Sequence, residues 1–294
     1  MERCRRLVIP PAWTEVWICP VENGHLQAVG TDVAGRRQYL YHPEWRIRRD
    51  TEKFEKMEGF ASSLLKHRAK SRRDLGGDDL GLERVVATAF SLLDIGMFRI
   101  GSDRYVEENG SYGLTTLEKH HVHTAGRGVS FSYAAKSGQE VEVTVRDERV
   151  RDVLEALRRR RGGGDRLLAY KAGNRWHPLD ADDVNTYIKD LLGEPYSAKD
   201  FRTWRGTSIA ALSLARADRG TPTARKKSVA AAMRDVSEHL GNTPAIARSS
   251  YVDPRVVDLF HDGITVKPDH RRVAPGATVS RTLERQVLRM LRRA

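Results

Sequence analysis

The chain has 294 residues, of which 39% are hydrophobic and 31% are charged, with 51 lysines and arginines against 39 acidic residues. The formal net charge of +12 predicts a polyanionic partner, most often a nucleic acid, although charge alone also fits a ribosomal or membrane-surface protein. No apolar run approaches the roughly 20 residues of a membrane-spanning helix, and the N-terminus lacks a signal-peptide core, so we expect a soluble intracellular protein. Cys4 and Cys19 lack metal-ligand spacing and predict free thiols in a reducing compartment.

Residues 7–45 predict a small β-rich unit. Short apolar runs at 17–19 and 25–29 are separated by turn residues at 22–24, and a second turn at 34–37 precedes a strand at 38–41. In that last strand Tyr39 and Tyr41 share one face, because side chains alternate along a strand. Two interpretations stay open: a face that lies on a nucleic-acid groove, or tyrosines packed in a half-buried sheet.

The next segments predict two helices that lead to an unusual arginine. From 45 to 70 apolar residues recur at helical spacing, and from 82 to 98 a strongly apolar helix is expected in the core. Arg99 then stands between apolar neighbours, Phe98 and Ile100, in a segment that Gly96 and Gly101 bracket. Burying a guanidinium is costly unless an anion meets it. Arg99 therefore indicates either a structural salt bridge or an anionic ligand.

A β-hairpin follows in the middle of the chain. Residues 105–117 are turn-rich, whereas 129–133 and 141–145 alternate as strands, and residues 135–138 carry the chemistry of a hairpin turn. Lys136 is therefore expected at or next to the tip. A lysine at such a tip is most often merely solvated.

The C-terminal half predicts a series of helices and one prominent tyrosine. Helices are expected at 147–160 with a solvated basic end at 158–161, at 180–192, around 208–214 after the segment 198–204, at 226–240 and at 282–293, with a loop at 268–275. Leu240 and Gly241 predict a helix end, and residues 242–244 begin another helix. The turn after it presents Tyr251 on a basic surface, where it is either a nucleophile for a phosphate or a packed tyrosine.

Four residues from separate segments occur in the order Arg, Lys, Arg, Tyr. Arg99 lies in Phe-Arg-Ile-Gly, Lys136 in the hairpin, Arg202 in Lys-Asp-Phe-Arg-Thr-Trp, and Tyr251 after Leu-Gly-Asn-Thr-Pro. With this set the sequence resembles the type IB DNA topoisomerases, specifically their compact poxvirus-like and bacterial branch. Further matching segments are 8–13 (Val-Ile-Pro-Pro-Ala-Trp), 35–45, 98–117, 197–207 and 236–264, so the resemblance covers most of the chain.

The resemblance implies a role for each residue of the set. Tyr251 attacks the scissile phosphate and holds it as a DNA 3′-phosphotyrosyl ester. Arg99 and Arg202 stabilise the negative charge on the nonbridging oxygens, since guanidinium groups match phosphate and stay protonated. Lys136 is the general acid for the leaving 5′-oxygen. The free end then swivels and is religated, which relaxes supercoils without ATP, metal or cofactor.

The resemblance also implies fold, partner and location. We expect an α+β fold with a small antiparallel β-rich N-terminal domain over 1–48. A larger, mainly α-helical catalytic domain with a small β-hairpin sheet is expected over 49–294, and the two domains form a C-shaped clamp. The partner is double-stranded DNA without any membrane, and the protein is expected to act as a monomer, cytoplasmic and associated with the nucleoid. Gln38, Tyr39, Tyr41 and Tyr105 match positions that contact DNA in the family.

Three departures from the family stand out. The position nine residues before the tyrosine is usually histidine, and here it is Asn242, which can donate one hydrogen bond to a phosphate oxygen but carries no charge. His239 lies on the preceding helix and is expected to cap or pack. Ser102 replaces a basic DNA contact of the poxvirus enzymes. Bacterial relatives carry a few tens of residues before the 8–13 segment, so the N-terminal domain is expected to be truncated, or its start misassigned.

Two alternatives stay open beside the topoisomerase. A site-specific tyrosine recombinase shares the catalytic fold and the Arg, Lys, Arg, Tyr set. Recombinases favour a histidine three residues before the second arginine, where this chain has Lys199, so the topoisomerase fits better. The other alternative is a basic DNA-binding protein with weakened catalysis, which only Asn242 and the short N-terminus indicate.

Overall fold

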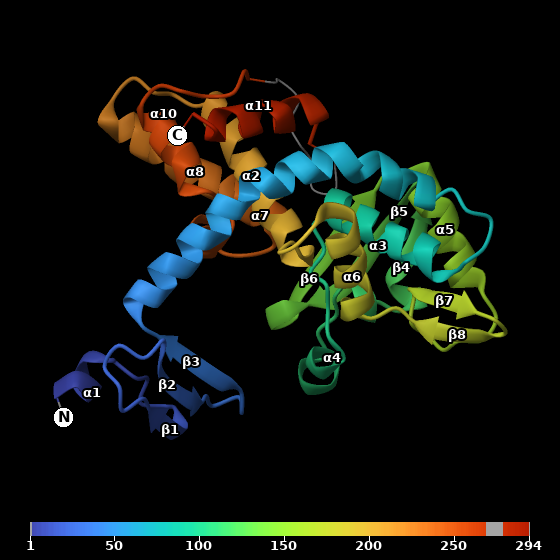
Figure 1. The fold of residues 1–294 in the computed structure, drawn as a ribbon, viewed down its shortest axis with the longest axis horizontal. Helices are drawn as coiled ribbons and strands as arrows, with labels where there is room; N and C mark the ends of the chain where they lie inside the picture. The colour runs from blue at the N-terminus through green and yellow to red at the C-terminus, as the bar shows by residue number, and fades with distance from the viewer. Residues whose placement is uncertain (1, 269–278, 294) are drawn as a thin grey trace. The chain divides into compact units, whose positions relative to one another are not determined.

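The computed structural model describes residues 2–268 and 279–293. Beyond residue 268, the loop expected at 268–275 lies outside the described residues. Internal contacts divide the chain into two units, Met1–Lys56 and Met57–Ala294, and each is described by itself (Figure 1). No helix among the described residues is both long and apolar enough to cross a membrane. Cys4 and Cys19 are free, as the sequence predicts.

The first unit contains a three-stranded antiparallel sheet in the order β1-β2-β3. Its elements are α1 (Glu2–Arg6), β1 (Thr14–Ile18), β2 (Leu26–Thr31) and β3 (Arg37–Tyr41). The turn before β3 forms because the Asp32 carboxylate accepts hydrogen bonds from the backbone of Ala34 (2.9 Å) and Arg36 (3.0 Å). Tyr39 and Tyr41 are 50% and 40% exposed. The alternative in which they pack in the core of the sheet is therefore wrong.

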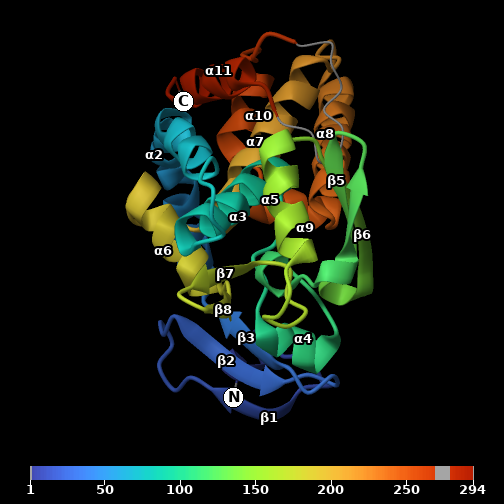
Figure 2. The same cartoon turned by 90° about the vertical axis from the view of Figure 1, so that its right-hand side faces the viewer.

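The long helix α2 (Pro43–Asp74) begins in the first unit and ends in the second. In the second unit α7 runs through the middle, and α3, α6, α8, α10 and α11 pack around it (Figures 1 and 2). The helices of this unit are α3 (Leu82–Gly96), α4 (Asp103–Asn109), α5 (Glu148–Arg159), α6 (Ala181–Leu192), α7 (Ala198–Ala215), α8 (Pro222–Leu240), α9 (Pro244–Ser250), α10 (Pro254–His261) and α11 (Arg281–Leu291).

An aromatic cluster forms the centre of the core beside α7. Phe201 meets Phe60 and Phe90 edge to face, each at 5.1 Å between ring centroids. Met57, Phe60 and Leu64 of α2 have no exposed surface, so the helical spacing read from the sequence marks the buried face of that helix. This packing anchors α7, which carries Arg202.

The second unit also contains a small antiparallel sheet and a separate hairpin. β4 (Val122–Ala125), β5 (Gly128–Ala135) and β6 (Gln139–Val145) pair in that order, and β7 (Ala169–Ala172) pairs with β8 (Arg175–Pro178). The structure confirms the predicted hairpin of β5 and β6. Strands β4, β7 and β8 were not expected from the sequence, because four residues give too short a pattern.

Two local expectations are corrected. The segment expected to be turn-rich at 105–117 contains the helix α4, which ends at Gly110 in the left-handed conformation (φ 58°). The basic end of α5 is not wholly solvated, because Arg160 is buried and donates to the carbonyls of Leu157 (2.8 Å) and Leu167 (2.9 Å).

Candidate active site

Arg202 is buried near the start of α7 and is held by two backbone carbonyls. The helix begins at a capping box in which the Ser197 amide donates to the Asp200 carboxylate over 2.8 Å. The side chain of Arg202 is 5% exposed. Its Nη1 donates to the Met97 carbonyl at 2.5 Å, and its Nη2 donates to the Leu240 carbonyl at 2.7 Å. These two bonds fix the orientation of the guanidinium.

Arg99 is positioned by a tight backbone contact just after α3. Met97 ends that helix in the left-handed conformation (φ 57°), which turns the chain out of the helix. The segment that follows packs backbone to backbone, since a Cβ added to Gly113 would lie 2.5 Å from the Gly101 Cα. Arg99 Nη2 then donates to the Gly241 carbonyl at 2.8 Å.

The two arginines carry charge that no carboxylate balances among the described residues. Beside the Tyr251 phenol, to which Arg202 donates, their acceptors are backbone carbonyls, which hold only partial charge. Burial lowers the pKa of Arg202, and the charge of Arg99 adds to that effect while the Tyr251 phenol opposes it. The sequence left two options for Arg99, a structural salt bridge or an anionic ligand. Among the described residues Arg99 forms no salt bridge. Two guanidinium groups without a balancing carboxylate are chemically suited to bind an anion.

Tyr251 follows α9, and its backbone is docked on α7. The ring centroid lies 5.1 Å from the guanidinium carbon of Arg202. Gly206, about one turn after Arg202, makes room for this approach, because a Cβ there would lie 2.7 Å from the Tyr251 carbonyl oxygen. The Thr207 hydroxyl donates to the same oxygen at 3.4 Å. The docking thus places the phenol beside the buried guanidinium.

The electrostatics of the site favour the phenolate form of Tyr251. Burial raises its pKa, but the charge of Arg202, a hydrogen bond from Arg202 and the charges of Arg99 and Lys199 together outweigh burial. The pKa of Tyr251 is therefore lowered below the 10.0 of a free tyrosine. Tyr133 of β5 behaves in the opposite way. Burial raises its pKa to about 12, although the charges of Arg99 and Arg202 lower it.

Lys136 lies at the tip of the hairpin between β5 and β6. It opens a short 3₁₀ turn over Lys136–Gly138, and its side chain is exposed. The ammonium lies 5.9 Å from the ring centroid of Tyr105, the aromatic residue of α4. The Tyr112 amide ties the segment after α4 to the hairpin by donating to the Ala134 carbonyl at 2.8 Å.

Asn242 lies in the junction between α8 and α9. Gly241 ends α8 in the left-handed conformation (φ 57°). Within the described residues neither Oδ1 nor Nδ2 of Asn242 has a hydrogen-bond partner, and both atoms are buried. An unpaired buried amide is costly unless a ligand satisfies it. His239 instead lies with Nδ1 2.7 Å from the Asp235 carbonyl of its own helix, as expected of a packing residue.

A pocket of about 420 Å³ gathers most of the predicted set. Its lining includes Arg99, Tyr105, Lys136, Lys199, Arg202 and Tyr251. Lys199 was noted from the sequence only as the recombinase histidine position, yet it lies one helical turn before Arg202. That i, i+3 spacing, which places both residues on one helix face, is the signal that could have found it.

The remaining predicted DNA contacts lie in the first unit. Tyr39 and Tyr41 stack with ring centroids 6.4 Å apart on the exposed face of β3. Gln38 points to the other side, where its amide donates to the Asp32 carboxylate at 2.8 Å. The three residues therefore do not share one face of the sheet.

Known proteins resemble the chain along nearly all of its length. The family model described as eukaryotic DNA topoisomerase I, catalytic core, matches residues 42–267, and the one described as bacterial DNA topoisomerase IB, N-terminal domain, matches residues 1–32. DNA topoisomerase 1B of Acanthamoeba polyphaga mimivirus is 31% identical over 285 residues, which cover 94% of this chain and 84% of the relative. DNA topoisomerase 1 of rabbit fibroma virus (strain Kasza) is 23% identical over 250 residues, covering 80% and 72%.

Proposed function

Because the chain belongs to the type IB DNA topoisomerases, a family of isomerases that act on DNA, we propose that it relaxes supercoiled duplex DNA. One strand is cleaved transiently, the free end swivels about the intact strand, and the break is religated. The energy of the phosphodiester is kept in a covalent bond to the enzyme, so the cycle uses no ATP.

The proposed cleavage step is a transesterification at phosphorus. The phenolate oxygen of Tyr251 forms a bond to the scissile phosphorus, the bond to the 5′-oxygen breaks, and Lys136 gives that oxygen its proton. Arg99 and Arg202 bind the nonbridging oxygens, where negative charge grows in the transition state. Asn242 donates a further hydrogen bond from its amide. Religation reverses these steps: the 5′-hydroxyl attacks phosphorus, Lys136 takes its proton, and the Tyr251 phenolate leaves.

The observation that carries the proposal is the environment of Tyr251. Its pKa is lowered in spite of burial, by two arginines that no described carboxylate neutralises. A phosphate placed between Arg99 and Arg202 meets that phenol directly. The unpaired amide of Asn242 supports the same placement, because a phosphate oxygen would satisfy it.

The proposal includes a second contact with DNA through the first unit. The exposed pair Tyr39 and Tyr41 offers aromatic faces to the duplex, and Gln38 lies in the same strand. The resemblance to the family implies that the two units act as the halves of a C-shaped clamp and that Tyr105 is a further DNA contact. We propose that this chain binds duplex DNA in that way as a monomer, on the nucleoid in the cytoplasm.

A plasmid relaxation assay tests the proposal. Supercoiled plasmid is incubated with the protein in EDTA and without ATP, beside a Tyr251→Phe control, and the products are resolved on a gel. Relaxation is expected with the unaltered protein and is lost with the control, which lacks the nucleophilic oxygen. Denaturant quenching should trap a protein–DNA adduct only when Tyr251 is present. Binding without any adduct would refute the chemistry, and strand exchange between defined sites would favour a recombinase.

A further inference from the structure

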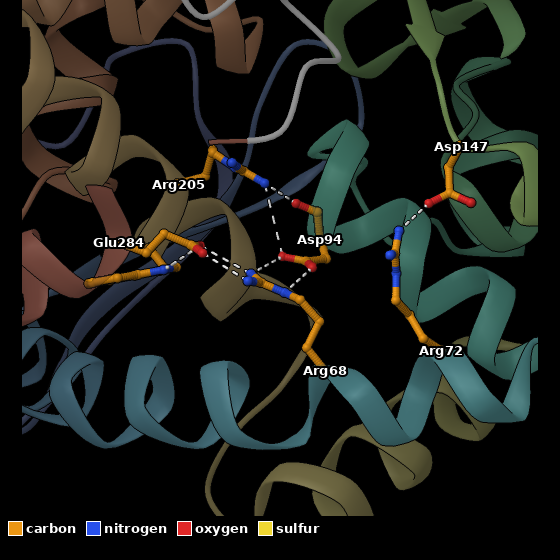
Figure 3. Close-up of polar contacts among 7 residues, drawn as sticks. Arg68, Arg72, Asp94, Asp147, Arg205 and Glu284 are labelled. Carbon is orange, nitrogen blue, oxygen red and sulfur yellow. Dashed lines mark hydrogen bonds and ion pairs between the residues drawn. The ribbon is translucent and has the colours of Figure 1, made fainter. Parts of the chain in front are cut away.

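A buried cluster of four charged side chains lies outside the lining of the pocket. Figure 3 shows Arg68 of α2 between Asp94 of α3 and Glu284 of α11, with Arg205 of α7 on the other side of Asp94. Arg68 Nε is 2.6 Å from an Asp94 oxygen, and its Nη1 donates to Glu284 at 2.8 Å. Glu284 also accepts from the indole nitrogen of Trp204 at 3.1 Å. Two arginines balance two carboxylates in this cluster.

Arg205 is the member of the cluster that reaches the chain leading to the active site. It is 4% exposed, and its Nη2 donates to the backbone carbonyl of Asp94, in the last turn of α3. The same nitrogen is 3.9 Å from the Asp94 carboxylate. Arg202, one turn earlier on α7, donates to the Met97 carbonyl at 2.5 Å. Two arginines of one helix therefore hold two carbonyls of the segment 94–97.

The geometry of this segment decides where both phosphate-binding arginines lie. Met97 takes the left-handed conformation (φ 57°) and ends α3, so the direction in which the chain reaches Arg99 depends on how the last turn is held. The Met97 carbonyl is also one of the two acceptors that orient Arg202. A shift of the Asp94 carbonyl would move Arg99 relative to α7 and would also move the Met97 carbonyl that orients Arg202.

We propose that Arg205 is a positioning residue, which sets the separation of the Arg99 and Arg202 guanidinium groups by holding the last turn of α3 against α7. This inference rests on the proposed function, because it concerns the arginines that bind the scissile phosphate there. Arg205 is 4% exposed and is not among the residues that line the pocket, so it does not reach the phosphate or the DNA. It acts through the segment 94–97 alone.

Stability by itself does not account for this arrangement. Buried ion pairs recover little more than the cost of removing their charges from water, and well-packed apolar residues can replace them without loss. What a guanidinium adds over an apolar side chain is direction, since its Nη2 donates to the Asp94 carbonyl and lies 3.9 Å from the Asp94 carboxylate.

Arg205→Met in the full chain tests the inference by single-turnover cleavage of a nicked duplex that traps the covalent adduct. The rate constant is expected to fall about a hundredfold, because misplacing a catalytic group by an ångström costs that much. The DNA dissociation constant and the final amount of adduct should stay unchanged. In an Arg202→Ala background the same substitution should slow cleavage by clearly less than a hundredfold, because only the effect through Arg99 remains.

Two further variants keep the experiment decisive. Arg160→Met is the matched control, because it removes another buried guanidinium that is bonded to carbonyls, and its cleavage rate should match the unaltered protein. If Arg205→Met does not fold, Arg205→Lys keeps the charge and is measured in the same cycle. Defects that multiply with Arg202→Ala, or a loss of adduct amount at an unchanged rate, would overturn the inference. The proposed function fails separately, if Tyr251→Phe still forms an adduct.

Discussion

Arg202 and Lys136 line the same pocket, but the protein holds them in opposite ways. Arg202 is 5% exposed, sits in a packed helix and is bonded to two carbonyls. Lys136 is exposed, in a three-residue 3₁₀ turn, with its ammonium 5.9 Å from the Tyr105 ring. One charge is fixed before any substrate arrives, whereas the other remains on a short turn at the surface.

The difference corresponds to the two tasks that we propose. A group that stabilises charge in a transition state works best when it is already oriented and costs no reorganisation. A group that delivers a proton and takes it back must meet two positions of the leaving oxygen, and its exposure allows it to exchange protons with water. The following predictions test whether the buried side and the exposed side of the pocket divide the work in this way.

The largest effect is expected for Lys136→Ala. Cleavage should slow by a factor on the order of 10² to 10⁴, the usual contribution of a general acid. Because the side chain is exposed, the thermal unfolding midpoint should not change. Replacing the leaving 5′-oxygen by sulfur should restore the rate, since a thiolate leaves without a proton.

Arg202→Ala is the matched comparison for this prediction. It removes charge stabilisation at the nonbridging oxygens, so the sulfur substitution should give no rescue. It also leaves two carbonyls without a donor, and the unfolding midpoint should fall. If sulfur rescues both variants or neither of them, the division between the two sides of the pocket is wrong.

A smaller effect is expected for Gly206→Ala on the buried side. The new Cβ would lie 2.7 Å from the Tyr251 carbonyl oxygen and 3.2 Å from the Tyr251 Cβ, so the tyrosine must move away from α7. We expect cleavage to slow about tenfold to a hundredfold, as misplacement of a reacting group by a fraction of an ångström predicts. Gly220→Ala is the control, because that glycine meets only the Asp218 side chain. Equal rates for both variants would show that the docking on α7 does not position Tyr251.

The smallest effect is expected for Lys199→Gln, measured as the cleavage rate against pH. The pKa of Tyr251 is lowered partly by the charge of Lys199. Removing that charge makes the phenolate less favourable, so the pKa rises and the increase of rate with pH moves to higher pH. Because Lys199 is exposed, solvent screens the effect, and the shift should stay under about one pH unit. A shift to lower pH, or none, would remove Lys199 from the electrostatics of the site.

The sequence predicted the long helices and the hairpin well, because their patterns are long. Helix α3 was expected at 82–98 and lies at Leu82–Gly96, and β5 and β6 cover the two predicted strands. The expected helix at 226–240 begins earlier in the structure, at Pro222, because Thr221 supplies a cap that apolar spacing does not mark. Elements of four to seven residues, such as β7 or α4, were missed because so few positions define no period.

The residues of the candidate site were predicted from the sequence one by one, but the contacts that hold them in place were not. Arg99, Lys136, Arg202 and Tyr251 could be named from motifs, and the structure brings them to one pocket. What holds them is tertiary: carbonyls from segments 38 and 105 residues away in the chain orient Arg202. Such contacts leave no trace in the local spacing of residues. Gly206, a glycine inside an apolar helix, is a local sign that the Tyr251 backbone packs closely against α7.

Three successive helices around Tyr251 begin in the same way, with a capping residue followed by proline. Thr221 and Pro222 start α8, Thr243 and Pro244 start α9, and Asp253 and Pro254 start α10. Each start is encoded locally, so these helices keep their registers independently of the residues on their outer faces. The number of residues between the starts, in contrast, sets where Tyr251 meets α7. This region should therefore accept many substitutions but no insertion or deletion, and libraries made to alter the enzyme should vary its side chains at constant length.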